Sequence, residues 1–223
     1  YDTGNSVNTV AVSADGEYIV VGSNSDKVYL FKKDSGTPLW SYETGDDVRE
    51  VAISADGEYI AGGSDDKKVY LFDKDSNTPL WSYDAGHNVY RVAISADGEY
   101  IATSTGAATN SKVYFFNKDS STPLWNASAG GFGGSSVSIS ADGEYIVTSA
   151  GMVNLFDKDS STPLWSYNTG GAVYSVDISA DGAYIVAGNS ANLVYLFDRD
   201  SSTPLWNYVT GDVVWSVSVS LDG

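Results

Sequence analysis

The sequence predicts an all-β fold assembled from repeated antiparallel units, and three observations support this prediction. One segment, Ser-Ala-Asp-Gly-Glu-Tyr-Ile, recurs along the whole chain. Short apolar or alternating runs lie between Asp-Gly, Ser and Pro turn signals, as expected for short β-strands. No part of the chain shows the 3.6-residue apolar period of an amphipathic helix. Aromatic residues make up 13% of the chain, and this residue class packs well on a pleated sheet.

The recurring segment divides the chain into units of about 41 residues. The copies begin at Ser13, Ser54, Ser95, Ser140 and Ser179, and a sixth begins at Ser220 near the end of the sequence. Self-similarity at such a period is the signature of a repeat architecture. The sequence therefore predicts five full repeats and the first strand of a sixth, within a size that suits a single domain.

Each repeat predicts four short strands. In the second copy we expect strands over Val48–Ser54, Tyr59–Ser64, Val69–Asp73 and Pro79–Tyr83. The third of these is apolar on both faces, which requires burial on both sides. Four-stranded sheets stacked radially around a central channel provide such burial. The predicted architecture is therefore a β-propeller of four-stranded antiparallel blades.

The predicted propeller is a single domain over residues 1–223, and the manner of its closure is open. The predicted blades span approximately 7–43, 48–84, 89–127, 135–167 and 173–208, with an extra strand over 214–220. Tyr1–Gly4 and Tyr208–Gly211 are the same element of the repeat, so they would compete for one position in a five-bladed ring. The alternative is that the chain is part of a six- or seven-bladed ring. An unpaired terminal strand would also invite self-association.

Three segments carry a resemblance to known propeller families. Gly86–Gly98 resembles the opening of a WD-repeat unit, and Val69–Asp73 resembles its closing strand, with Phe72 in place of Trp. Asp75–Trp81 is similar to the docking motif of quinoprotein-like propellers, with a shorter spacing. The resemblance covers the whole chain and implies the same β-propeller fold. The chain departs from the WD family because only one copy keeps the Gly-His pair, at His87.

The five copies differ mainly in one group of loops. In an up-and-down blade, the first-to-second and third-to-fourth connections share one face of the disc, and these are nearly constant here. The other connections share the opposite face and vary strongly. Loops on a rigid scaffold carry binding, and Tyr, Trp and Arg dominate binding hot spots. The sequence thus predicts a partner-binding face, with drift in tolerant loops as the alternative. The candidate residues are Arg49, Glu50, His87, Tyr90, Arg91, Phe132, Tyr174 and Trp215.

The constant elements predict structural roles. One tryptophan per repeat is expected to pack between blades or to cap a blade edge. These residues are Trp40, Trp81, Trp125, Trp165 and Trp206. The proline two residues before each tryptophan suits the start of an outer edge strand, where a backbone donor is dispensable.

Charge and residue usage exclude several classes of function. The formal charge is −17, which repels phosphate backbones, so nucleic acid is not an expected partner. No apolar run is long enough to cross a membrane as a helix. The chain has no Cys and one His, so we predict no metal site and no catalytic triad. Alternating carboxylates at Asp73–Asn77 lack the Gly and the closing Glu of a calcium loop, and a self-capping turn is favoured.

The sequence leads to a ranked set of functions. The first is a non-catalytic scaffold that binds a protein or a glycan through the variable face and needs no cofactor. The second is a structural subunit of an extracellular layer, sheath or filament, and the third is a propeller enzyme. The repeats resemble those of archaeal and bacterial surface proteins, and Asn126–Ser128 is a glycosylation sequon. Both features point to an extracellular or cell-surface location, with the cytoplasm as the alternative.

Overall fold

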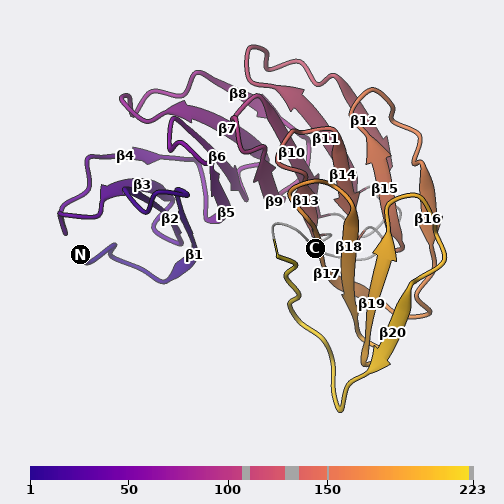
Figure 1. Cartoon of the computed structure of the whole chain (residues 1–223). Coiled ribbons are helices and arrows are strands. Elements are labelled where there is room, and N and C mark those ends of the chain that lie inside the picture. The colour runs from indigo at the N-terminus through magenta and orange to yellow at the C-terminus, as the bar shows by residue number, and fades with distance from the viewer. Residues whose placement is uncertain (107–110, 129–135, 150, 221–223) are drawn as a thin grey trace.

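The protein consists of five four-stranded sheets arranged around a common axis. The computed structural model describes residues 1–106, 111–128, 136–149 and 151–220. Within these ranges each sheet is built from four consecutive antiparallel strands. The sheets stand side by side as blades, in an arc that is open between the first and the fifth (Figure 1). The predicted all-β propeller of four-stranded blades is confirmed.

The strands have nearly the same bounds in every blade. The first blade contains β1 (Val7–Val12), β2 (Tyr18–Ser23), β3 (Lys27–Lys32) and β4 (Trp40–Glu43). The second contains β5 (Val48–Ile53), β6 (Tyr59–Ser64), β7 (Lys68–Asp73) and β8 (Trp81–Asp84). The third contains β9 (Val89–Ile94), β10 (Tyr100–Thr105), β11 (Lys112–Asn117) and β12 (Trp125–Ser128). The fourth contains β13 (Val137–Ile139), β14 (Tyr145–Thr148), β15 (Val153–Asp157) and β16 (Trp165–Tyr167). The fifth contains β17 (Val173–Ile178), β18 (Tyr184–Asn189), β19 (Leu193–Asp198) and β20 (Trp206–Val209).

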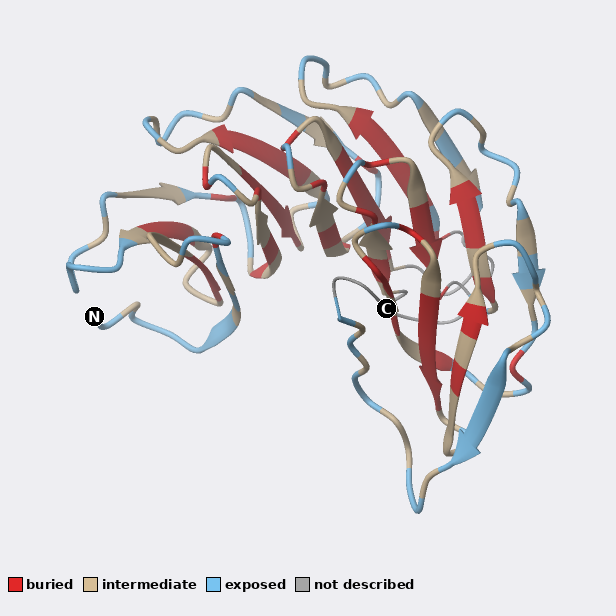
Figure 2. Cartoon of the chain, in the orientation of Figure 1, coloured by how far each residue is buried: buried red, intermediate tan, exposed pale blue. Residues whose placement is uncertain are grey.

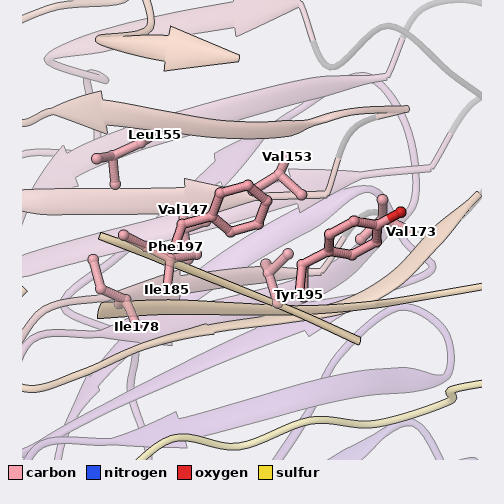
Figure 3. Close-up of a cluster of buried hydrophobic side chains, with 10 residues drawn as sticks. Val147, Val153, Leu155, Val173, Ile178, Ile185, Tyr195 and Phe197 are labelled. Carbon is pink, nitrogen blue, oxygen red and sulfur yellow. The ribbon is translucent and has the colours of Figure 1, made fainter. Parts of the chain in front are cut away.

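The hydrophobic core lies between neighbouring blades. The two middle strands of each blade are the most buried, while the outer strands are partly exposed and β20 is exposed along its length (Figure 2). Between the fourth and fifth blades, side chains from both sheets interdigitate (Figure 3). This cluster joins Val147, Val153 and Leu155 to Ile185 and Phe197. Apolar residues on both faces of the middle strands are therefore buried, as the repeat pattern predicts.

Two contacts recur between consecutive blades on the face that carries the Ala-Asp-Gly turns, which we call the constant face. The Ala14 amide donates to the Ala55 carbonyl at 3.0 Å, and the pattern continues through Ala96, Ala141 and Ala180. The Trp81 indole donates to the Lys118 carbonyl at 2.7 Å. The Trp40, Trp125 and Trp165 indoles make the same bond to the next blade. These four tryptophans confirm the predicted packing between blades, whereas Trp206 has no following blade and is 49% exposed.

The predicted strand over residues 214–220 is absent, which corrects the sequence prediction. Residues 213–220, called the terminal segment below, pair with no strand of the described chain. They lie instead beside the fifth blade, where the Val214 amide donates to the Asn189 carbonyl at 3.2 Å. The Val217 amide donates to Ser175 Oγ at 3.2 Å. The segment occupies the place of a sixth inner strand, but it lacks the neighbouring strand that would complete a ladder.

Among the described residues, the fold contains no helix that is long and apolar enough to cross a membrane.

Candidate functional site

The variable loops gather on one face of the arc, which we call the variable face. The Asp65 amide donates to the Asp47 carbonyl at 2.9 Å, and Thr44 Oγ1 donates to the Asp26 carbonyl at 2.9 Å. Each bond joins a blade-to-blade loop to a connection between a second and a third strand. Both groups of variable connections therefore lie together, opposite the constant turns.

A polar depression opens at the axis on the variable face, and we call it the rim depression. Its volume is about 410 Å³. The first residues of the inner strands line it, because each inner strand begins on the variable face and ends at a constant turn. Five predicted residues contribute to it: Arg49, Glu50, Arg91, Tyr174 and Trp215.

Two ion pairs fix the arginines of the rim depression. Arg91 Nη1 lies 3.1 Å from Glu50 Oε2, which links the third blade to the second. Arg49 forms an ion pair with Asp65 and lies 3.4 Å from a carboxylate oxygen of Asp47. Arg49 Nε and Asp65 Oδ1 are buried without a hydrogen-bond partner among the described residues. The pair thus retains one donor and one acceptor that its internal contacts do not use.

Glu50 lies in a polar but poorly hydrated position. Burial raises the pKa of Glu50 above its usual value, although the charge of Arg91 and its hydrogen bond oppose this shift. The side chains of Glu50 and Arg91 keep 30% and 42% of their surfaces accessible. The ion pair is therefore reachable by a partner and sensitive to any further loss of water.

An aromatic pair stands at the opposite side of the rim depression. The rings of Tyr174 and Trp215 stack at 4.8 Å with an interplanar angle of 9°. Trp215 is 71% exposed, so its second ring face is free to contact a partner. Paired charges and an exposed aromatic surface are the groups that anchor binding interfaces.

Three of the predicted residues do not join this site. Tyr90 packs over Gly106, where a Cβ would lie 1.8 Å from Tyr90 Cε2, so its ring is tucked into its own blade. His87 lines a separate depression with Ser111, Lys112 and Tyr114, towards the outer strands of the third blade. Phe132 lies outside the described residues.

Five further residues with small polar side chains line the rim depression: Asn8, Thr9, Ser136, Ser175 and Ser216. The first four lie at the starts of inner strands, and Ser216 lies in the terminal segment. Comparison of the repeats already places all of them except Ser136 among the divergent strand-entry residues of this rim. Their side chains are too small to be counted among the hot-spot candidates.

Three carboxylates of the described residues lie close together on the variable face. Ligand atoms of Asp26, Asp46 and Asp47 lie within 4.8 Å of one another. Burial, followed by the charges of Asp47 and Asp46, raises the pKa of Asp26. Oxygen ligands of this kind suit a hard cation such as Ca²⁺. The sequence-level calcium candidate is instead a self-capping turn, since Asp73 Oδ1 accepts the Asp75 amide at 2.8 Å.

Comparison with known proteins assigns the chain to a family. No curated protein sequence matches it. A solved structure described as the crystal structure of the mitotic checkpoint complex contains a chain that is 18% identical, with a TM-score of 0.82. That match covers 100% of this chain and 74% of the other, and it shows a shared fold. The family described as outer membrane protein assembly factor BamB matches residues 3–208. The chain therefore belongs to this family of quinoprotein-like β-propellers.

Proposed function

We propose that this chain is a non-catalytic scaffold that binds a partner through the variable face, and that the rim depression is the centre of the contact. A protein is the favoured partner, and a glycan is the alternative. The observation that supports the proposal is that five of the predicted residues line one depression, which therefore combines two arginines, a glutamate and two aromatic rings. The repeat register alone brings the first residues of the inner strands to this rim, so the support lies in their residue types.

The chemistry of the rim depression suits an extended polypeptide. Its serines and Asn8 offer donors and acceptors to a peptide backbone, and Trp215 offers an exposed ring to an apolar side chain. The family description names an assembly factor, and such a role requires contact with other proteins.

Phage-displayed random peptides provide a test that needs no known partner. Peptides are selected on the wild-type chain, and their dissociation constants are then measured on Arg49→Ala, Tyr174→Ala and Trp215→Ala. We expect each substitution to weaken the selected peptides about tenfold or more, because hot-spot residues carry most of the binding energy.

Two control variants match the aromatic substitutions. Tyr90→Ala removes a ring that is tucked over Gly106, and Tyr208→Ala removes a ring that is 67% exposed far from the axis. Selected peptides should keep their affinity for both variants within about twofold. Peptides that are insensitive to all three rim substitutions, or equally sensitive to Tyr208→Ala, would contradict the proposal.

A structural subunit of an extracellular layer or filament is the second candidate, because both ends of the arc expose apolar side chains. Val10 is 56% exposed at one end, and Val209 is 67% exposed at the other. Light scattering over a range of protein concentrations separates the candidates. Growth of large assemblies without any partner would favour the structural role.

A further inference from the structure

Every blade boundary inside the arc uses the same pair of surfaces. Val48 and Val51 of the second blade pack against Val20, Val28 and Leu30 of the first. We call the surface that contacts the preceding blade the leading face and the surface that contacts the following blade the trailing face. The same two surfaces meet between the second and third, third and fourth, and fourth and fifth blades.

The two ends of the arc leave one surface of each kind uncovered. On the leading face, Val7 and Val10 of the first blade are 49% and 56% exposed, whereas their counterparts Val48 and Val51 are 0% and 3% exposed. On the trailing face of the fifth blade, Trp206 is exposed and its indole donates to no described residue. These apolar surfaces consist of the same repeat positions that are buried in the four internal interfaces.

Residues that match parts of a neighbouring repeat already contact both ends of the arc: Tyr1 at the first blade and the terminal segment at the fifth. Tyr1 contacts Tyr29 and Phe31 at ring-centroid distances of 5.7 and 5.6 Å. Tyr42 of the first blade packs in the same way on Tyr70 and Phe72 of the second, at 5.5 and 5.2 Å. Tyr1 therefore stands where the outer strand of a preceding blade would place its tyrosine.

The terminal segment repeats the contacts of an inner strand at the other end. A Cβ at Gly188 would lie 2.4 Å from Val214 Cγ1, just as one at Gly63 would lie 2.6 Å from Val89 Cγ1. β5 continues into a ladder with β6, in which Val51 opposes Gly62 and Ile53 opposes Ile60. The terminal segment has no such partner within the described chain. Its open edge and the trailing face beside it form one continuous surface.

We propose that the trailing end of the arc is a docking site for strands two to four of another blade of the same repeat. The incoming strands pair with the terminal segment and cover the trailing face of the fifth blade. The partner is defined by its chemistry. It carries the Tyr-Ile strand that opposes an inner strand, the Val-Tyr-Leu-Phe strand that packs on a trailing face, and a Lys carbonyl that accepts a tryptophan indole. Strand addition of this type gains affinity from main-chain hydrogen bonds.

The internal boundaries fix the expected geometry. By analogy with β5 and β6, Val217 opposes a glycine of the incoming strand and Val219 opposes an isoleucine. By analogy with Trp40, which lies 5.4 Å from Phe72 and donates to the Lys74 carbonyl at 2.7 Å, Trp206 stacks on an incoming phenylalanine. The terminal segment also contributes Trp215 and Ser216 to the rim depression. The contacts proposed here use Val217, Val219 and Trp206 instead, so they do not depend on the proposed function.

A peptide with the sequence of residues 58–83 tests the proposal on the whole chain. The peptide contains Ile60, Phe72 and Lys74, and it carries a fluorophore for anisotropy measurements. We expect saturable binding with one peptide per chain. Hydrogen exchange should show new protection of the Ser216 and Ser218 amides, because Val217 and Val219 already donate their amides to the fifth blade.

Substitutions at matched repeat positions identify the end that binds. Val217→Asp places a carboxylate under the incoming strand, and Trp206→Ala removes the stacking ring and donor. Each should weaken binding about tenfold or more. Val10→Asp is the control, because Val10 holds the same repeat position as Val217 but lies at the leading end. Val10 belongs to β1, which is already paired with β2, so no incoming strand pairs there. Its affinity for the peptide should remain within about twofold of wild type.

Three outcomes would overturn the proposal. The first is no binding of the peptide to a folded, monomeric chain. The second is equal binding to wild type and Val217→Asp, or equal binding of a control peptide that carries Ile60→Asp and Leu71→Asp. The third is self-assembly of the chain, seen by light scattering, that Val217→Asp abolishes and excess peptide leaves intact. That result would make a second copy the occupant of this end.

Discussion

The two faces of the arc are built on the same strands but are stabilised in different ways. On the constant face, one set of contacts is repeated at every blade boundary, from the Ala14–Ala55 hydrogen bond to the Trp165 indole on the Arg199 carbonyl. On the variable face, contacts between blades are individual, as in the ion pair of Arg91 with Glu50. A residue that makes the same contact at each boundary is held constant by the architecture. A residue with an individual contact is free to change.

The tryptophans give the strongest test of this difference. Trp81→Ala removes the tilted ring contact with Phe116, at a centroid distance of 5.3 Å, and the hydrogen bond to the Lys118 carbonyl. We expect a loss of about 3 kcal/mol in the free energy of unfolding, measured with urea. Trp206→Ala changes the same repeat position in the fifth blade, where no following blade contacts the tryptophan. We expect it to lower the free energy of unfolding by about 1 kcal/mol or less. Equal losses would show that the tryptophan stabilises its own blade only.

The glycines of the Asp-Gly turns provide a second test of the contacts between blades on the constant face. Gly98 has φ +74°, and a Cβ there would lie 2.5 Å from Tyr59 Cδ2 of the preceding blade. Gly16 has φ +71° and no neighbour within 4 Å. Gly16→Ala therefore measures backbone strain alone, about 1 kcal/mol, while Gly98→Ala adds an overpacking cost of about 1–2 kcal/mol. Thermal unfolding of the two variants would refute this reasoning if their melting temperatures fell equally.

A substitution on the variable face should have a smaller effect on stability. Glu50→Gln removes a carboxylate whose ionised form is disfavoured by burial and stabilised by one accessible arginine. The free energy of unfolding should change by less than about 1 kcal/mol at neutral pH. A loss as large as that of Trp81→Ala would place the rim ion pair among the structural contacts and contradict the distinction between the faces.

Acidification should affect the two faces in opposite ways. Burial raises the pKa of Glu50, so its contribution to stability is full below the unfolded pKa and is lost as pH rises through the folded pKa. Hydrogen bonds from Ser13 and Ser179 lower the pKa of Asp15 and Asp181, so their contribution is present above the unfolded pKa and is lost as pH falls through the folded pKa. Carboxyl carbon NMR should show Glu50 titrating at higher pH than Asp15 and Asp181. The reverse order would contradict the assignment.

The fold was largely predictable because the same signal occurs five times. The expected strand Tyr59–Ser64 coincides with β6, and Val48–Ser54 differs from β5 only at its last residue. The fourth strand begins at Trp81 rather than Pro79, because proline has no amide to donate and the paired register with β7 ends at Leu71 opposite Trp81. The terminal segment shows where prediction from the repeat pattern fails. Its sequence matches an inner strand, but a strand also requires a partner.

The candidate site was predictable to the level of a face, but not of individual side chains. Repeat comparison located the variable face and five residues of the rim depression. It did not foresee that Tyr90 would cover Gly106, because this contact depends on the path of a loop that occurs in one blade only. It also missed the pairing of Arg49 with Asp65, since Arg49 lies in β5, Asp65 lies in the turn after β6, and no periodic pattern relates them.

The alanine hydrogen bonds that run from blade to blade have a consequence for the energetics of the whole molecule. The strand contacts between blades join consecutive blades, so the coupling is between nearest neighbours, as in a linear repeat protein. The free energy of unfolding is then a sum of blade and boundary contributions, and the first and fifth blades each have only one boundary. We therefore expect the backbone amides of the first and fifth blades to exchange their hydrogens by local opening before those of the third blade.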